Sequence, residues 1–355
     1  MVRRHTYEIV LKFKKEGTPT TFFIGNVSYT GSSIYKDHVK IDSHMITIRA
    51  NRSSKIDLNK IFYNHSSSIY KQIIKTLISY YSHSGKFTAL SVIEISRKRA
   101  NKTLDKKILG DKEFQQILDK SFKLNYTIDV VSLNEMLDKS EKSHVLLLSI
   151  SFLLKANSID IPSLRFERLW KAFNVLYRFI GQKSTESDCL RELRVFILQN
   201  HIRFPLSSGF VSPITKLNLR SSIRWRDMIL NDFDTEAKTR HLNDFILRYT
   251  DVRIMQIVKE TNFLYREDFL KRGNFFNSVE AHVDGHISSN TKNDVELVSV
   301  LALKYMYYLR NKTFHGERID SEFRLLVNKE IKEFEFLNKV LEILVIDLIN
   351  CSDLY

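Results

Sequence analysis

The sequence predicts a two-part protein, an α+β N-terminal domain at residues 1–129 followed by an all-α helical bundle at residues 130–355. Apolar residues alternate with a period of two in the first quarter of the chain, as in half-buried strands. From about Ser67 their spacing changes to three and four, as in amphipathic helices. Strand signals then disappear after about residue 130. A chain of 355 residues is long enough to bury two cores of ordinary size.

The N-terminal strands and their helix can be located individually. Tyr7, Ile9, Leu11 and Phe13 share one face of the first predicted strand. Further strands are expected at residues 22–24, 45–48 and 87–95, and a helix from Ser67 to about Gly85. We interpret this domain as a module that binds or senses a substrate or a trigger.

The helical half begins with a strongly aromatic segment. Phe166, Trp170, Phe173 and Tyr177 recur at helical spacing between Pro162 and Gly181. Polar residues at 184–188 are typical of a helix N-terminus, and that helix runs towards Asn200. Further helices are expected at residues 219–230, 235–263, 295–309 and 323–348. At least five helices in this order predict a bundle.

The charge of the chain favours a polyanionic partner. The formal net charge is +14 and the isoelectric point is about 9.5, so nucleic acid is the leading partner class. The alternative is a basic surface that is only solvated. Cys189 and Cys351 form no disulfide framework and have no metal-ligand spacing, which predicts a cytoplasmic protein. We expect no signal peptide, no transmembrane segment, no metal and no cofactor.

The segment Y-L-R-N-K-T-F-H-G-E at residues 308–317 holds the principal catalytic candidates, Arg310, Asn311 and His315. RNA can be cut without a metal because its own 2′-hydroxyl attacks the phosphate. Histidine suits the acid and base roles because its pKa lies near neutrality. Arginine suits the charged phosphorane because its planar fork matches phosphate oxygens. An asparagine beside them would orient the imidazole or contact the phosphate.

The spacing of these residues sets a geometric condition. Residues five apart in a regular helix differ by roughly 140° in direction, so the helix must end, bulge or kink between Arg310 and His315. An Arg-x(4–6)-His pattern is expected about twice by chance in this chain, and it occurs twice. The second match, Arg194 with His201, lacks the neighbouring Asn and is interpreted as an ordinary helix end.

The sequence around Arg310 resembles the HEPN superfamily of helical domains. The resemblance rests on Arg-Asn-x3-His at the end of an apolar helix, a long closing helix, and the segment R-F-E-R-L-W-K-A-F-N-V-L-Y-R-F-I at residues 165–180. That segment is similar to the large aromatic helix of the Apea-like branch. The resemblance covers at most residues 130–355. It implies a metal-independent RNase in which Arg310, Asn311 and His315 take the positions of the family signature.

The resemblance also implies a homodimer, since these nucleases usually place two Arg–His motifs across an interface. Two histidines can then divide the base and acid roles. Family members act in antiviral defence, in toxin–antitoxin systems and in RNA processing, so an antitoxin or other regulatory partner is an expectation too. The alternative is a non-catalytic module that binds RNA or protein, because some members have lost catalysis.

Several other residues are candidates for supporting roles. Arg97, Lys98, Arg99, Lys102 and Lys312 are expected RNA contacts, the first four in a basic run after a strand. Glu167 and Asn174 either reach the same cleft as the catalytic candidates as supporting polar residues or belong to the solvated face of an amphipathic helix. Trp225, between Arg224 and Arg226, either stacks on a base or is a half-buried aromatic residue of a helix, which is the favoured interpretation. His282, Asp284 and His286 would be the ligands of a metal-dependent hydrolase, but a surface turn is the favoured interpretation.

Overall fold

The computed structural model describes residues 5–29, 34–99, 102–314, 325 and 329–355. Two compact units are present, Met1–Phe179 together with Ile349–Tyr355, and Ile180–Leu348. The division therefore falls after Phe179, whereas the sequence predicted it at residue 129, where the strands end. The helices that follow the strands group with the sheet because they pack on its covering helix.

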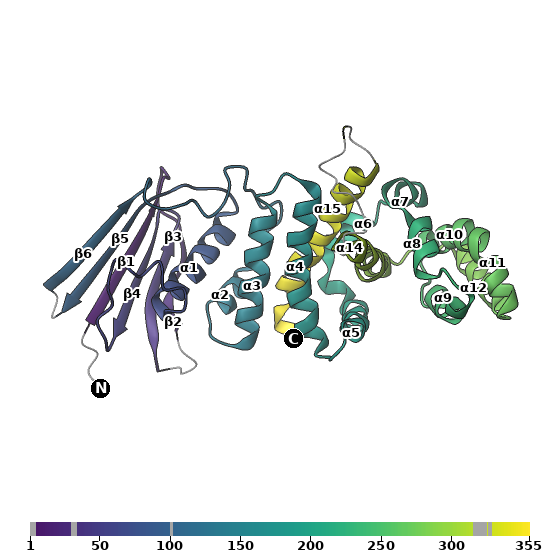
Figure 1. Cartoon of the computed structure of the whole chain (residues 1–355), viewed down its shortest axis with the longest axis horizontal. Helices are drawn as coiled ribbons and strands as arrows, with labels where there is room; N and C mark the ends of the chain where they lie inside the picture. The colour runs from purple at the N-terminus through teal and green to yellow at the C-terminus, as the bar shows by residue number, and fades with distance from the viewer. Residues whose placement is uncertain (1–4, 30–33, 100–101, 315–324, 326–328) are drawn as a thin grey trace. The chain divides into compact units, whose positions relative to one another are not determined.

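The first unit contains a six-stranded antiparallel sheet (Figure 1) with the strand order β2-β3-β4-β1-β5-β6. Its strands are β1 His5–Phe13, β2 Thr21–Ser28, β3 Lys36–Asp42, β4 Met45–Arg52, β5 Leu90–Arg99 and β6 Lys102–Gly110. The four strands expected from the sequence are confirmed. Strands β3 and β6 were not predicted, because charged residues interrupt their apolar alternation.

The core of this unit lies between the sheet and helix α1, Ser68–Ser84. Tyr7, Ile9 and Leu11 are fully buried on the face of β1 that α1 covers. Phe13 stacks on Tyr80 of α1 with 3.6 Å between the ring centroids. The helix begins after the cap Ser67 and ends at Gly85, whose φ of 63° is left-handed and favours glycine. Both boundaries agree with the sequence prediction.

Three further helices belong to the first unit in whole or in large part. They are α2 Val130–Met136, α3 Glu141–Ala156 and α4 Pro162–Gly181, the aromatic helix expected from the sequence. Helices α2 and α3 pack against α1. The chain end also belongs here, since Ser132 donates to the carbonyl of Ile349 and Asp129 N–H donates to Asn350. Phe166, Trp170 and Phe173 are buried, as their spacing predicted.

The second unit contains helices and connecting turns, with no strand among its described residues (Figure 1). Its helices are α5 Glu186–Gln199, α6 Pro205–Val211, α7 Lys216–Ser222, α8 Trp225–Asp232, α9 Thr239–Leu247, α10 Val252–Val258, α11 Leu264–Arg272, α12 Phe276–Ser289, α13 Asp294–Val300 and α14 Met306–Phe314, with α15 Lys329–Asn350 up to Leu348. The expected helices are confirmed in kind within the described residues, although the segment 219–230 is divided into α7 and α8, and the segment 235–263 is two helices and a wider turn. Most of residues 323–328, at the start of the last expected helix, lie outside the described residues. No helix among the described residues has the length and apolar character needed to cross a membrane.

Two wider turns of the π type interrupt the helices of this unit. One is Lys259–Phe263, between α10 and α11, and the other is Leu301–Tyr305, between α13 and α14. Such turns insert an extra residue, which changes the direction of the side chains that follow, and they are frequent at functional sites. Both turns lie beside the cavities described below.

Candidate functional site

Arg310 lies on α14 with a guanidinium that two neighbouring side chains hold. Its Nη1 donates to Asn311 Oδ1 at 2.9 Å and lies 3.8 Å from Glu186 Oε2. The side chain of Arg310 is 23% exposed, so it is accessible at one end and packed along its stem. Arg310 and Asn311, which the sequence placed in one site, are therefore in direct contact.

Glu186 is a site residue that the sequence analysis did not identify. It is the first residue of α5, which begins there because the Thr185 side chain accepts from the N–H of Asp188. The hydroxyl of Tyr307 donates to the same Glu186 oxygen at 3.3 Å. Tyr307 lies one turn before Arg310 on α14, so both side chains converge on one carboxylate. The acid had been interpreted only as favourable for the helix N-terminus, and no local signal linked it to a residue more than a hundred positions away.

The helix break expected between Arg310 and His315 does not occur in the described part of that segment. Helix α14 continues through Phe314, and the departure from regular geometry comes earlier, at Leu301–Tyr305. The Thr313 hydroxyl donates to the carbonyl of Leu309, one turn earlier in the same helix, at 2.9 Å. His315 lies outside the described residues, so its position relative to Arg310 stays a prediction. Lys312 is half-buried on α14.

A cavity of about 160 Å³ lies next to Tyr307. It is lined by Ser187, Leu190, Arg191, Arg194, Phe245, Arg248, Tyr249, Leu303, Lys304 and Tyr307. Four of these side chains are cationic, and three of them have a carboxylate partner outside the lining: Arg191 with Asp188, Arg194 with Glu296 and Lys304 with Asp232. Arg191 and Arg248 are exposed at the surface. The cavity therefore places the exposed Arg191 and Arg248 near Tyr307. The hydroxyl of Tyr307 in turn contacts the Glu186 carboxylate that Arg310 also approaches.

Arg194, the arginine of the second Arg–His pattern, is a wall of this cavity. Its Nη2 donates to the carbonyl of Arg248 at 3.0 Å, and its guanidinium lies 5.3 Å from the ring centre of Tyr249. Glu296 is 3.9 Å away. His201 lies exposed on a short 3₁₀ turn, His201–Arg203, after α5. The pair remains interpreted as an ordinary helix end.

The basic run forms the end of β5 and the start of β6, and its side chains divide between the two faces of the sheet. Arg97 is only 8% exposed, because strand alternation places it on the covered face, where its Nε donates to Asp105 at 2.8 Å. This corrects its expected role as an RNA contact. Lys98 lies on the opposite face and pairs with Glu8. Arg99 and Lys102 are exposed at the strand ends and stay predicted contacts.

Glu167 and Asn174 make local contacts along α4. Glu167 pairs with Lys171 at 2.6 Å, and Asn174 accepts from Arg178 Nε at 2.8 Å. These pairs one turn apart fit the solvated-face interpretation. Trp225 is only 4% exposed, and its indole N–H donates to Asn262 Oδ1 at 3.1 Å. It is therefore a core aromatic rather than an exposed stacking platform.

The segment His282–His286 is helical, not the surface turn that was favoured. It belongs to α12 because Val279 and Val283, four residues apart, are both fully buried. The two histidine rings are 4.5 Å apart, and His282 Nε2 lies 2.8 Å from the carbonyl oxygen of Tyr249. Asp284 pairs instead with Lys259 at 2.7 Å. In the part of the chain that the structure describes, no three His, Cys, Asp or Glu side chains are grouped to hold a metal.

Comparison with known proteins adds no relative. No protein-family model, no curated protein and no solved structure matches the chain. The interpretation of the site therefore depends on its own residues and geometry.

Proposed function

We propose that the chain is an endoribonuclease that cleaves RNA without a metal, with Arg310, Asn311 and His315 as its catalytic residues. The observation that carries the proposal is the Arg310 guanidinium, held by Asn311 and Glu186 in the helix that immediately precedes His315. A guanidinium that is already oriented loses little freedom when a phosphate arrives, which favours transition-state binding. The resemblance to the HEPN superfamily supplies the expected role of each residue.

The reaction proceeds by attack of the RNA 2′-oxygen on the adjacent phosphorus. A base removes the 2′-hydroxyl proton, the bond to the 5′-oxygen breaks, and an acid protonates that oxygen. The products are a 2′,3′-cyclic phosphate and a free 5′-hydroxyl. Arg310 stabilises the charge on the phosphorane, Asn311 orients its neighbours, and His315 supplies the base or the acid.

A homodimer is part of the proposal, because one imidazole cannot hold both the base and the acid role in a single step. A second copy of the chain would bring a second His315 to the site. The dimer would form through the helical domain. A cytoplasmic location, and a role in antiviral defence or as a toxin restrained by an antitoxin or other regulatory partner, follow from the same resemblance. The sheet of the first unit would then sense the substrate or the trigger.

The alternative function is RNA binding without cleavage. The cavity beside Tyr307 favours it, since the exposed Arg191 and Arg248 at its edge suit a phosphate backbone whether or not a bond is broken. Lys98, Arg99, Lys102 and Lys312 would add further contacts. Both functions require RNA to bind, so only the presence or absence of RNA cleavage distinguishes them.

The deciding experiment incubates the purified full chain with end-labelled single-stranded RNA in excess EDTA. We expect fragments with 2′,3′-cyclic phosphate ends. His315→Ala should lower the cleavage rate by about 10² to 10⁴, the usual contribution of a general acid or base. His201→Ala is the matched control and should keep the wild-type rate. Cleavage that persists in His315→Ala contradicts the proposed site, and binding without cleavage under every condition favours the binding module.

A further inference from the structure

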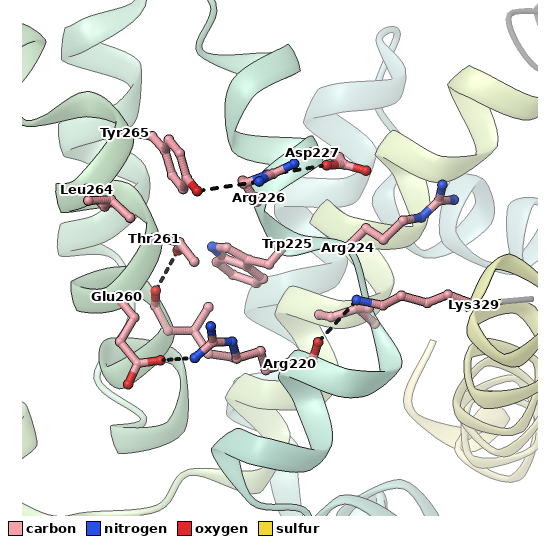
Figure 2. A pocket seen from close by; sticks show the side chains of 12 residues that line it. Arg220, Arg224, Trp225, Arg226, Asp227, Glu260, Thr261, Leu264, Tyr265 and Lys329 are labelled. Atoms are coloured by element: carbon pink, nitrogen blue, oxygen red, sulfur yellow. Dashed lines mark hydrogen bonds and ion pairs between the residues drawn. The ribbon is translucent and has the colours of Figure 1, made fainter.

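A second cavity, of about 410 Å³, lies in the second unit between α7, α8 and the wider turn before α11 (Figure 2). It is lined by Arg220, Ile223, Arg224, Trp225, Arg226, Asp227, Ile257, Glu260, Thr261, Leu264, Tyr265 and Lys329. None of the catalytic candidates belongs to this set. The cavity is therefore separate from the proposed catalytic residues.

Three cations at the cavity are accessible to a ligand. The side chains of Arg220 and Arg226 are 69% and 58% exposed, and Lys329 is exposed at the start of α15. Lys329 Nζ donates to the backbone carbonyl oxygen of Arg220 at 3.5 Å, whereas the Arg220 guanidinium points away from Lys329 towards Glu260 (Figure 2). Glu260 is the nearest carboxylate to Arg220, at 3.3 Å, and Lys216 pairs with it as well. Two cations thus share one acid, which leaves positive charge at this side of the cavity.

Arg224 lines the cavity but is committed elsewhere. Its Nε and Nη2 both donate to Glu333 Oε2, at 2.9 and 2.6 Å. Burial opposes its charge, but the hydrogen bond with Glu333 raises the pKa of Arg224 above its ordinary value. Arg224 therefore anchors the start of α8, with Trp225 as the buried floor, and leaves ligand contacts to its neighbour Arg226.

The side of the cavity that α11 forms carries an aromatic ring. The hydroxyl of Tyr265 accepts from Arg226 Nη1 at 3.5 Å, and the guanidinium of Arg226 lies 5.6 Å from the ring centre (Figure 2). Leu264 beside it is 70% exposed, an unusual position for a large apolar side chain at a cavity edge. The wider turn Lys259–Phe263 brings Glu260 and Leu264 to this same edge.

We propose that this cavity binds a nucleotide unit, with the base against Tyr265 and Leu264 and the phosphate at the exposed guanidinium groups of Arg226 and Arg220. A flat ring beside a guanidinium offers stacking to any base. Exposed guanidinium groups suit a phosphate, and Glu260 and Asp227 can accept hydrogen bonds from amino or hydroxyl groups of the ligand. The nucleotide is either free or part of an RNA strand. The inference does not depend on cleavage at Arg310.

The test measures binding of two probes to the full chain. Free AMP and UMP are titrated in a Trp170→Phe background, in which Trp225 on the cavity floor is the one remaining tryptophan reporter. A fluorescein-labelled, non-cleavable 2′-O-methyl RNA of ten nucleotides is titrated by anisotropy. Tyr265→Ala should weaken binding about tenfold, and Tyr265→Phe should restore it. Arg226→Ala should weaken it and, for RNA, make the slope of log affinity against log salt shallower by about 0.7 for each phosphate that the variant no longer neutralises.

Arg240→Ala is the matched control, because Arg240 is an exposed arginine of the same unit outside the cavity. If Tyr265→Ala and Arg226→Ala bind only the RNA probe more weakly than the wild type, the natural ligand is a nucleotide within a strand. If they bind AMP or UMP more weakly, the natural ligand is a free nucleotide. The inference is overturned if neither probe binds the wild type. It is also overturned if Tyr265→Ala and Arg226→Ala change both affinities no more than Arg240→Ala does. If the variants weaken binding but the wild type gives no product in the cleavage assay with unmodified RNA, the proposed nuclease is contradicted and this inference is retained.

Discussion

Removal of the Glu333 carboxylate should destabilise the second unit strongly. Glu333 is fully buried on α15 and accepts from the Arg224 side chain, from the Arg224 backbone N–H at 3.1 Å and from the Tyr305 hydroxyl. Burial, reinforced by Glu333, raises the pKa of Tyr305 well above its ordinary value, so this hydroxyl remains a donor at all physiological pH values. In Glu333→Ala, Arg224 loses the partner that compensates its charge.

The expected magnitude follows from the burial of the pair. Breaking a buried ion pair by removing one partner costs about 3–5 kcal/mol. Arg224 is 23% exposed, and Glu330 at 3.8 Å remains near it, so the lower end of the range applies. We expect a loss of about 3 kcal/mol. With a urea dependence of about 2 kcal/mol per molar, the unfolding midpoint falls by about 1.5 M.

The two tryptophans allow this loss to be assigned to one unit. Trp225 lies in the second unit and Trp170 in the first, so Trp170→Phe and Trp225→Phe backgrounds each leave one fluorescent reporter. Urea unfolding of Glu333→Ala should shift the Trp225 midpoint. Glu335→Ala, an exposed acid two residues along the same helix, is the control and should change stability by less than about 0.5 kcal/mol. Equal shifts for the two variants, or a shift seen only at Trp170, would refute the reasoning.

Two other predictions concern stability. A Cβ on Gly181 would lie 2.6 Å from the Cα of Cys189, so Gly181→Ala should lower the free energy of unfolding by about 1–3 kcal/mol, measured by urea unfolding. Gly209→Ala is the control, because its Cβ would meet no atom within 4 Å. An equal loss for both variants would contradict the close approach at Gly181. Burial, and then the charge of Lys139, lowers the pKa of Lys75 from 10.5 to about 8. Between these values the unfolded chain binds a proton that the folded chain lacks, so stability contributed by Lys75 rises with pH from 8 to 10.5, by about 3 kcal/mol at most. Lys75→Met should remove this rise in unfolding curves followed through Trp170, and an unchanged pH slope would show that Lys75 stays protonated.

Local sequence signals predicted the helices and strands whose patterns are long and regular. The alternation from Tyr7 to Phe13 and the caps Ser67 and Gly85 correspond to physical requirements of one element, so they are readable without the rest of the chain. Strand β6 is different. It is an edge strand rich in lysine, which protects an open edge but hides the apolar alternation on which the prediction depends.

The candidate sites depend on long-range packing, which local patterns describe poorly. Arg310 and Asn311 could be chosen as neighbours, but Glu186 enters the site only because α5 starts beside α14. Gly285 suggested a loop at His282–His286, whereas the burial of Val279 and Val283 outweighs the modest cost of one glycine in a helix. Trp225 has the composition of a stacking residue, yet its indole closes the floor of the cavity. Its neighbour Arg226 is exposed and the distant Tyr265 is half-buried beside it, and the wider turn that precedes Tyr265 has no signature in the sequence.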